Sequence, residues 1–244
     1  MSDTRDERAA RVDTGALYEN TKVKFIATVE ALPATSLQLA VPATPEWSVR
    51  DVLAHVVGLS ADLNAQRFPA PDDVGGHAWT AGQVQRGAGR PVADLRVEWE
   101  LEAPVFEDGL RAFGYEMGSH FVADLHAHYQ DVRGAIGVAR EQDELTVRVA
   151  LDHYTGFVDG LLSGAGWGTL DVDAAGETVQ LGSAGNHRAR LRASPFDVLR
   201  AFSGRRSARQ IRALEWEGDV DAFLEFLASG FPGGYSLPVA DLVE

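Results

Sequence analysis

Four amphipathic segments in roughly the first 140 residues constrain the fold of this chain more than any other feature of its sequence. Each carries apolar residues at three- and four-residue spacing, the period of a helix with one buried face. They cover residues 12–32, 48–63, 92–113 and 119–137. The stretch 41–47, marked by two prolines, is expected to be an extended loop. Four such helices joined by ordinary loops predict a four-helix bundle.

Local signals predict where these helices begin and end. Ser48 followed by Asp51 matches a capping box, with the serine as N-cap. The helix that follows has an apolar face, and His55 lies on that face, pointing toward the core. Ser119 is expected to open the fourth helix, and Pro104 predicts a kink or a split in the third. The third helix is expected to bury Leu95, Trp99, Val105, Phe106 and Leu110.

The pattern changes near residue 142 from helical to mixed. The elements predicted beyond it are a helix over 149–162, strands over 169–173, 178–181 and 187–193, and helices that begin at Pro195 and cover 208–214 and 222–227. We therefore expect a mainly α protein with two domains, a four-helix bundle over 1–142 and a small α+β domain over 143–244. The first dozen residues are expected to be frayed.

Composition excludes several classes of protein. The 244 residues carry a formal net charge of −14 and no basic stripe interleaved with aromatics, so no nucleic acid partner is expected. No apolar run reaches the roughly 18 residues that suggest a membrane span. The charged N-terminus lacks an apolar signal segment, which predicts a soluble, cytoplasmic protein. Because cysteine is absent, a metal would need histidine and carboxylate ligands.

Two separate segments place three metal-ligand side chains where they could converge. Asp124 and His128 are four residues apart in the fourth helix, so they share one face and lie one turn apart. His55 lies on the inner face of the second helix. If these helices face each other, two imidazoles and one carboxylate meet at one point. Such a set can hold a divalent metal and leave coordination positions open.

The combination carries more weight than any one of these residues. A single inward histidine is more often a hydrogen-bonded core residue, but three buried polar groups are costly unless something satisfies them, and a metal would do so. His120 shares the stripe of Asp124 and His128, so it could replace or support a ligand. Its place beside Ser119 favours a capping or solvent-facing role instead. His126 lies roughly opposite this stripe and is expected outside the site.

The same residues carry a resemblance to a known family. The matching pieces are residues 42–56 (PATPEWSVRDVLAHV), Trp79-x3-Gln83-Val84, Arg90 and Asp124-x3-His128-x2-Asp131. They resemble the mycothiol-dependent maleylpyruvate isomerase-like proteins of the DinB-like superfamily. Residues 194–207 (SPFDVLRAFSGRRS) resemble the C-terminal part of such proteins, which is a sterol-carrier-like α+β domain. The resemblance covers nearly the whole chain, and the segment around His55 is its most specific piece.

The resemblance implies a metal and a thiol. In this family the metal is typically Zn2+, held by a histidine at the position of His55, a glutamate where this chain has Asp124, and a histidine at the position of His128. Aspartate is one methylene shorter, which reduces its reach by about 1.5 Å. The implied co-substrate is mycothiol, whose thiol the metal activates for attack on an electrophilic carbon. An arginine of the C-terminal domain contributes to catalysis in the isomerase, and Arg205 is the nearest match here.

Three functions remain open at the level of sequence. The first is a mycothiol S-transferase that depends on zinc or another divalent metal, in which the thiol stays attached to a small-molecule electrophile. The second is a maleylpyruvate-type cis–trans isomerase, in which the thiol adds, lets a bond rotate and leaves. The third is a non-catalytic small-molecule-binding protein with a vestigial metal site. The expected partners are a low-molecular-weight thiol and an electrophile, with the protein a monomer or a homodimer.

Overall fold

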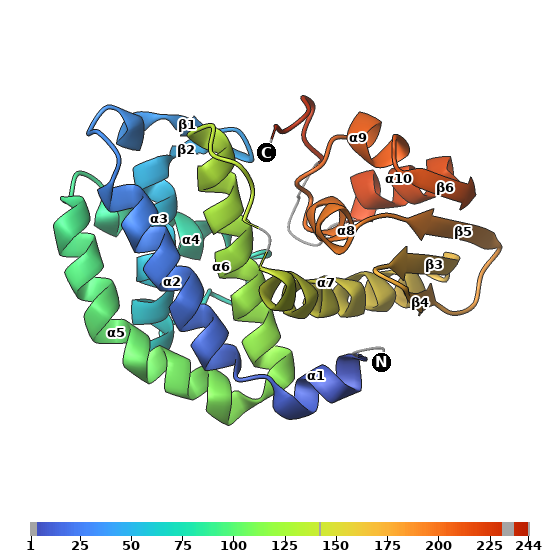
Figure 1. Cartoon of the computed structure of the whole chain (residues 1–244), viewed down its shortest axis with the longest axis horizontal. Coiled ribbons are helices and arrows are strands. Elements are labelled where there is room, and N and C mark those ends of the chain that lie inside the picture. Colours follow the sequence, from blue (N-terminus) through green and yellow to red (C-terminus); the bar gives the residue numbers. More distant parts are fainter. Residues whose placement is uncertain (1–3, 142, 231–236, 244) are drawn as a thin grey trace. The chain divides into compact units, whose positions relative to one another are not determined.

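Two compact units make up this mainly α chain (Figure 1). The computed structural model describes residues 4–141, 143–230 and 237–243. One unit is helical and covers residues 13–141, and the other is a small α+β unit that joins residues 4–12 to the described residues beyond 142. This is the fold class that the sequence predicts. No helix among the described residues is long and apolar enough to cross a membrane.

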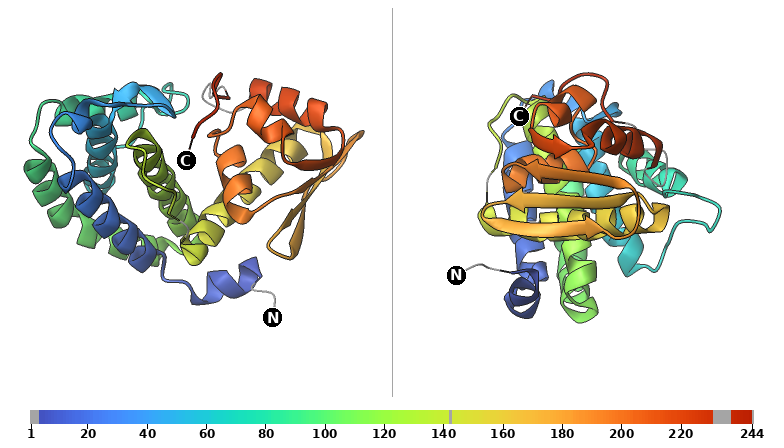
Figure 2. Two further views of the ribbon diagram at one scale, coloured as in Figure 1. Left: turned by 45° about the horizontal axis from the view of Figure 1, so that its top comes forward. Right: turned by 90° about the vertical axis from the view of Figure 1, so that its right-hand side faces the viewer.

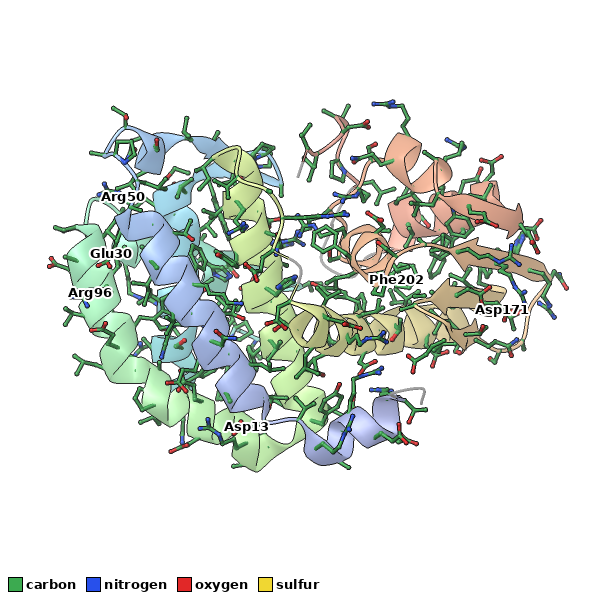
Figure 3. The ribbon with its side chains drawn as sticks, viewed as in Figure 1. Asp13, Glu30, Arg50, Arg96, Asp171 and Phe202 are labelled. Carbon is green, nitrogen blue, oxygen red and sulfur yellow. The ribbon has the colours of Figure 1, made fainter. Side chains whose placement is uncertain are left out.

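The helical unit is a bundle built around aromatic contacts. Its helices are α2 (Thr14–Glu30), α3 (Val49–Asn64), the shorter α4 (His77–Gly87), α5 (Val92–Phe113) and α6 (Tyr115–Ala135). Helix α2 packs on α5 and α6, and α3 packs on α4, α5 and α6. In the core, Tyr18 and Phe25 of α2 meet the ring of Trp99 edge-on, with centroids 6.5 and 5.9 Å apart. At one end, Arg96 of α5 pairs with Glu30 at 3.0 Å (Figure 3).

A short antiparallel pair of strands precedes α3, where the sequence predicts an extended loop. The chain passes through a single 3-10 turn (η1, Ser36–Gln38) into β1 (Ala40–Val41) and β2 (Thr44–Ser48). Ser48 ends β2 and caps α3, as predicted. Its Oγ accepts a hydrogen bond from the backbone nitrogen of Asp51 at 3.3 Å, and Asp51 Oδ2 accepts one from the Ser48 nitrogen at 2.9 Å. This capping box starts the helix that carries His55.

The predicted start of the fourth helix is wrong. Helix α6 begins at Tyr115, and Ser119 lies inside it, where its hydroxyl donates to the carbonyl oxygen of Glu116 at 3.1 Å. The break falls at Gly114, whose φ of +83° belongs to the left-handed region that favours glycine. Ser119 is a residue type that suits an N-cap, but the turn at Gly114 starts the helix earlier. Asp124 and His128 therefore lie more than one turn after the start of α6.

Two expectations for α5 are also corrected. The sequence predicts a kink or a split at Pro104. The helix is continuous through Pro104, so the split is wrong and the kink stays a prediction, and Pro104 lies on the exposed side of the helix. Val105 is 63% exposed, although Leu95, Trp99, Phe106 and Leu110 are buried as expected. Each residue advances a helix by about 100°, so Val105 is turned away from the stripe that Phe106 occupies.

Helix α4 packs so closely on α3 that one contact tolerates no side chain. A Cβ at Gly87 would lie 2.2 Å from the Cβ of Ala54. Replacing Gly87 with alanine is therefore expected to push α4 outward and destabilise the helical unit by about 1–3 kcal/mol. Urea unfolding followed by circular dichroism measures this change. In the control Gly109→Ala, within α5, an added Cβ meets no described atom within 4 Å, and alanine favours the helix. Equal stability of Gly87→Ala and wild type would contradict the packing.

The second unit is a four-stranded sheet covered by helices. Its elements are α7 (Glu144–Ala165), β3 (Gly168–Ala174), β4 (Glu177–Gly182), β5 (His187–Arg192), α8 (Pro195–Phe202), α9 (Ala208–Arg212), β6 (Glu215–Gly218) and α10 (Val220–Gly230). The strand order is β4-β3-β5-β6 (Figure 2). Strands β3 and β5 are parallel, and the other two pairs are antiparallel. The sequence missed β6, a short strand of four residues.

Alternation along β3 separates a core face from a charged face. Leu170 and Val172 join the core with Phe202 of α8 and Phe223 of α10. On the other face, charged side chains cross the parallel strands in register. Arg190 pairs with Asp171 at 3.1 Å and Arg192 with Asp173 at 3.2 Å.

A short N-terminal helix belongs to this second unit. Helix α1 (Arg5–Arg11) places Arg8, 4% exposed, against Asp152 of α7. The Arg8 Nε and Nη2 donate to the two carboxylate oxygens at 2.8 and 2.6 Å. The expectation of a frayed first dozen residues is therefore wrong for residues 4–12. Contacts also group these residues with the C-terminal unit and not with the bundle expected over 1–142.

Candidate metal centre

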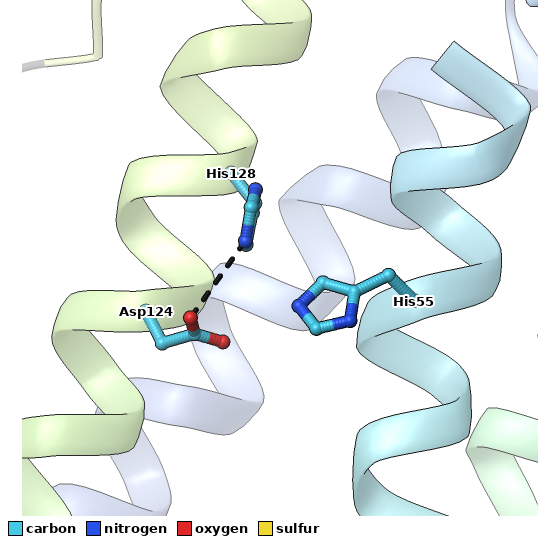
Figure 4. A group of neighbouring side chains, drawn as sticks. All are labelled: His55, Asp124 and His128. Carbon is cyan, nitrogen blue, oxygen red and sulfur yellow. Dashed lines mark ion pairs between the residues drawn. The ribbon is translucent and has the colours of Figure 1, made fainter. Parts of the chain in front are cut away.

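His55 of α3 and Asp124 and His128 of α6 converge inside the helical unit (Figure 4). One potential ligand atom of each lies within 4.8 Å of the other two. The Nε2 of His128 is 3.7 Å from Oδ1 of Asp124, and the two imidazole centroids are 4.8 Å apart. Both histidines are buried, whereas Asp124 is partly exposed. The structure thus brings together the three residues predicted as ligands, and their binding of a metal stays a prediction.

The donor set fits a divalent cation. Zinc binds histidine nitrogen and carboxylate oxygen at about 2.0–2.2 Å, so two ligand atoms on one tetrahedral ion lie roughly 3.3 Å apart. The 3.7 Å between His128 and Asp124 exceeds this by less than about half an ångström. The potential ligand atom of His55 lies within 4.8 Å of the other two. Three ligands of this kind leave a fourth position open, as in catalytic zinc sites.

Both imidazoles turn Nε2 toward the shared centre and Nδ1 away from it. The Nδ1 of His55 lies 2.8 Å from Oε1 of Gln83, so the ring nitrogen that faces Asp124 and His128 is Nε2 (Figure 4). The Nδ1 of His128 lies 3.6 Å from Oδ2 of Asp131, a carboxylate with no exposed side-chain surface. A hydrogen-bond partner behind the ring orients metal-binding histidines in proteins, and Gln83 is such a partner for His55.

A buried carboxylate lies behind Gln83. Asp62 of α3 accepts hydrogen bonds from Gln83 Nε2 at 3.1 Å, Arg86 at 2.6 Å and Arg67 at 2.8 Å. Burial raises the pKa of the Asp62 carboxyl, but the hydrogen bonds from Arg86, Arg67 and Gln83 outweigh burial and hold this pKa below its ordinary value. Asp62 is therefore ionised at neutral pH.

Trp47 of β2 forms an apolar wall beside the two histidines. Its ring centroid lies 5.1 Å from that of His55 and 6.0 Å from that of His128. Sequence reasoning gave no site role to Trp47, Gln83 or Asp131. The available signal was their position, since all three belong to the segments that carry the family resemblance.

The other histidines of α6 do not join the ligand group found among the described residues. His120 is exposed and packs edge-on against Phe121, with centroids 4.8 Å apart. Its exposure agrees with the solvent-facing role favoured by the sequence, but a capping role is wrong, because α6 begins at Tyr115. His126 is buried elsewhere on the helix, as a residue outside the site.

Arg205 lies between α8 and α9 in the second unit. It is half-buried, and its Nη1 donates to the carbonyl oxygen of Ser203 at 2.7 Å. Its backbone nitrogen donates to the carbonyl oxygen of Arg200 at 2.8 Å, which fixes the turn after α8. The role of Arg205 toward a substrate stays a prediction.

Two helices of the bundle bring two imidazoles and one carboxylate together in its interior. This arrangement is typical of the class of helical bundles that build a metal site between facing helices. Residues 22–133 match the model of the mycothiol maleylpyruvate isomerase N-terminal domain. The match covers most of the helical unit and confirms, for these residues, the resemblance found in the sequence.

Two solved structures share the fold over most of both chains. One is a mycothiol-dependent maleylpyruvate isomerase, 13% identical, with a TM-score of 0.52, covering 79% of this chain and 88% of that chain. The other is a mutant of such an isomerase, 12% identical, with a TM-score of 0.54, covering 84% of this chain and 91% of that chain. At this identity the likeness shows the fold alone. No curated protein matches the chain significantly.

Proposed function

We propose that this protein is a metal-dependent enzyme that activates a low-molecular-weight thiol, of the mycothiol kind, for attack on an electrophilic small molecule. The observation that carries the proposal is the convergence of His55, Asp124 and His128 in a bundle of this family. A divalent cation, with zinc expected, would supply Lewis acidity and lower the pKa of a thiol at the open position. Because the chain has no cysteine, the nucleophilic sulfur has to come from a co-substrate.

The protein residues have distinct parts in this proposal. His55 and His128 offer their Nε2 atoms, and Asp124 offers a carboxylate from the more exposed side. The ring of Trp47 lies beside both histidines, and an apolar neighbour of this kind lowers the local dielectric and strengthens electrostatic interactions there. Arg205 is proposed, from the family resemblance, to orient an anionic group of the electrophile.

The family and the two solved structures support an isomerase of the maleylpyruvate type. In that reaction the thiol adds to the substrate, a bond rotates and the thiol leaves. The S-transferase predicted from the sequence differs in its last step, because the thiol stays bonded to the electrophile. Both reactions need the same thiol activation, so the pocket and the electrophile decide between them.

One pair of incubations separates these outcomes. Zinc-loaded protein is mixed with mycothiol and either a bimane electrophile or maleylpyruvate, and the products are followed by mass spectrometry. A stable thiol adduct that forms faster than without protein indicates transfer. Conversion of maleylpyruvate to its trans isomer with the thiol recovered indicates isomerisation. Metal-free protein whose melting temperature does not rise with zinc would favour a small-molecule-binding protein with a vestigial site.

Replacing Asp124 with glutamate is expected to retain or tighten zinc binding. The longer side chain adds about 1.5 Å of reach, and the ligand atoms have to close from their present separations to surround an ion. Isothermal titration with zinc measures the dissociation constant. The control Asp124→Asn keeps the length and removes the charge, so it is expected to weaken binding. Clear loss of zinc from Asp124→Glu would show that the site is spaced for aspartate.

A further inference from the structure

Gln83 joins the candidate ligand His55 to a buried, charged cluster. It comes from α4, whereas His55 and Asp62 both come from α3, and Gln83 and Asp62 are each 1% exposed. The hydrogen bonds run from His55 Nδ1 to Gln83 Oε1 at 2.8 Å and from Gln83 Nε2 to Asp62 Oδ2 at 3.1 Å. We call these three residues the α3–α4 relay.

Charge at one end of the relay sets the direction of every hydrogen bond in it. Asp62 is held ionised by Arg67 and Arg86, and an ionised carboxylate only accepts hydrogen bonds. Gln83 therefore turns its amide NH₂ toward Asp62 and its carbonyl oxygen toward His55. A carbonyl oxygen also only accepts, so the proton of a neutral His55 lies on Nδ1. The lone pair is then on Nε2, the nitrogen that faces Asp124 and His128.

Close packing holds the amide in this position. A Cβ at Gly58, one turn beyond His55 on α3, would lie 2.8 Å from the Cβ of Gln83. The missing side chain therefore lets α4 approach α3 at this point, and Gln83 sits against the helix that carries both of its partners. A buried amide confined in this way has little freedom to swing away from His55.

We propose that Asp62 and Gln83 fix the Nδ1-protonated tautomer of His55 and so present its Nε2 lone pair to the metal. Gln83 is a positioning residue, because it contacts His55 at Nδ1, the ring nitrogen turned away from Asp124 and His128. The inference rests on the proposed function for its purpose, but the tautomer of His55 is a property of the metal-free protein. Without an acceptor at Nδ1, a neutral imidazole carries its proton on either nitrogen and meets the cation with its lone pair only part of the time.

The test begins with the metal-free wild type. Nitrogen–proton correlation spectra of the histidine rings are expected to show His55 protonated on Nδ1. In Gln83→Met, which keeps the side-chain length and loses the amide, the tautomer is expected to become mixed. The zinc affinity, measured by competition with a chromophoric chelator, is expected to fall 10- to 100-fold. The control Gln130→Met removes an equally buried glutamine of α6, whose amide donates to the Glu141 carbonyl oxygen at 2.9 Å. It should leave the His55 tautomer unchanged.

Asp62→Asn is a second variant that leaves Gln83 in place. Asparagine has the shape of aspartate but can donate, so the Gln83 amide is free to flip and present its NH₂ to His55. The expected result is a shift of His55 toward protonation on Nε2, which a purely structural role for Asp62 does not produce. If Gln83→Met does not fold, this variant decides. A wild-type His55 protonated on Nε2, or a tautomer unmoved in both variants, would overturn the inference. Wild-type protein that binds no zinc would contradict the proposed function and leave the inference about the His55 tautomer standing.

Discussion

Replacing His55 with alanine is expected to abolish stable zinc binding. The candidate site has three protein ligands, and the variant removes one of its two imidazoles. Loss of a partner that merely orients a metal ligand costs about 10- to 100-fold in metal affinity, so loss of the ligand itself is expected to cost on the order of 100-fold or more. Zinc per protein, measured by elemental analysis after gel filtration, is expected to fall from about one to near zero.

A matched histidine provides the control for this result. His120 lies on α6 but is exposed and outside the ligand group, so His120→Ala makes the same chemical change away from the site. Its zinc content is expected to equal that of the wild type. Circular dichroism should show His55→Ala to be folded. Zinc retained by His55→Ala, or lost from His120→Ala, would assign the metal to different residues.

Replacing Arg8 with methionine is expected to destabilise the second unit by about 3–5 kcal/mol. The Arg8 guanidinium makes two hydrogen bonds to Asp152, and both residues are buried. The variant leaves the Asp152 carboxylate in a desolvated position without this counterion, which is costlier than the loss of an exposed pair. Thermal unfolding followed by circular dichroism measures the effect, and a fall of the melting temperature on the order of 10 °C or more is expected.

Two further variants isolate the buried pair. Arg11→Met changes an exposed arginine of the same helix and is expected to alter stability by less than about 0.5 kcal/mol. The double variant Arg8→Met with Asp152→Leu removes both charges, so it is expected to recover much of the stability lost in the single variant. If Arg8→Met proves as stable as the wild type, α1 does not dock through this pair, and the frayed N-terminus expected from the sequence would be correct.

Elements specified by neighbouring residues could be predicted from the sequence. The Ser48–Asp51 capping box involves atoms three residues apart, and alternating residues identified β3. The elements that were missed or misplaced depend on distant partners or on a turn. Helix α1 is held by Asp152, β6 by its pairing with β5, and the start of α6 by the backbone conformation of Gly114.

The residues of the candidate site also divide into those that could be predicted from the sequence and those that could not. Helical spacing alone puts Asp124 and His128 on one face and turns His55 inward, so these three residues could be singled out from the sequence. Helical spacing could not single out Gln83, because α4 is a separate short helix. Its amide reaches His55 only because Gly58 and Gly87 let that helix lie close to α3. Positioning groups of this kind depend on packing and leave no period in the sequence.

The docking of α1 on α7 has a consequence for synthesis on the ribosome. Arg8 and Asp152 are separated by 144 residues, and at about 5–20 residues per second their translation takes roughly 7 to 29 s. During that interval the whole helical unit is synthesised and can fold, whereas α1 has no Asp152 to bind. The α+β unit closes only when α7 has followed, so deleting α1 is expected to harm the unit that is translated last.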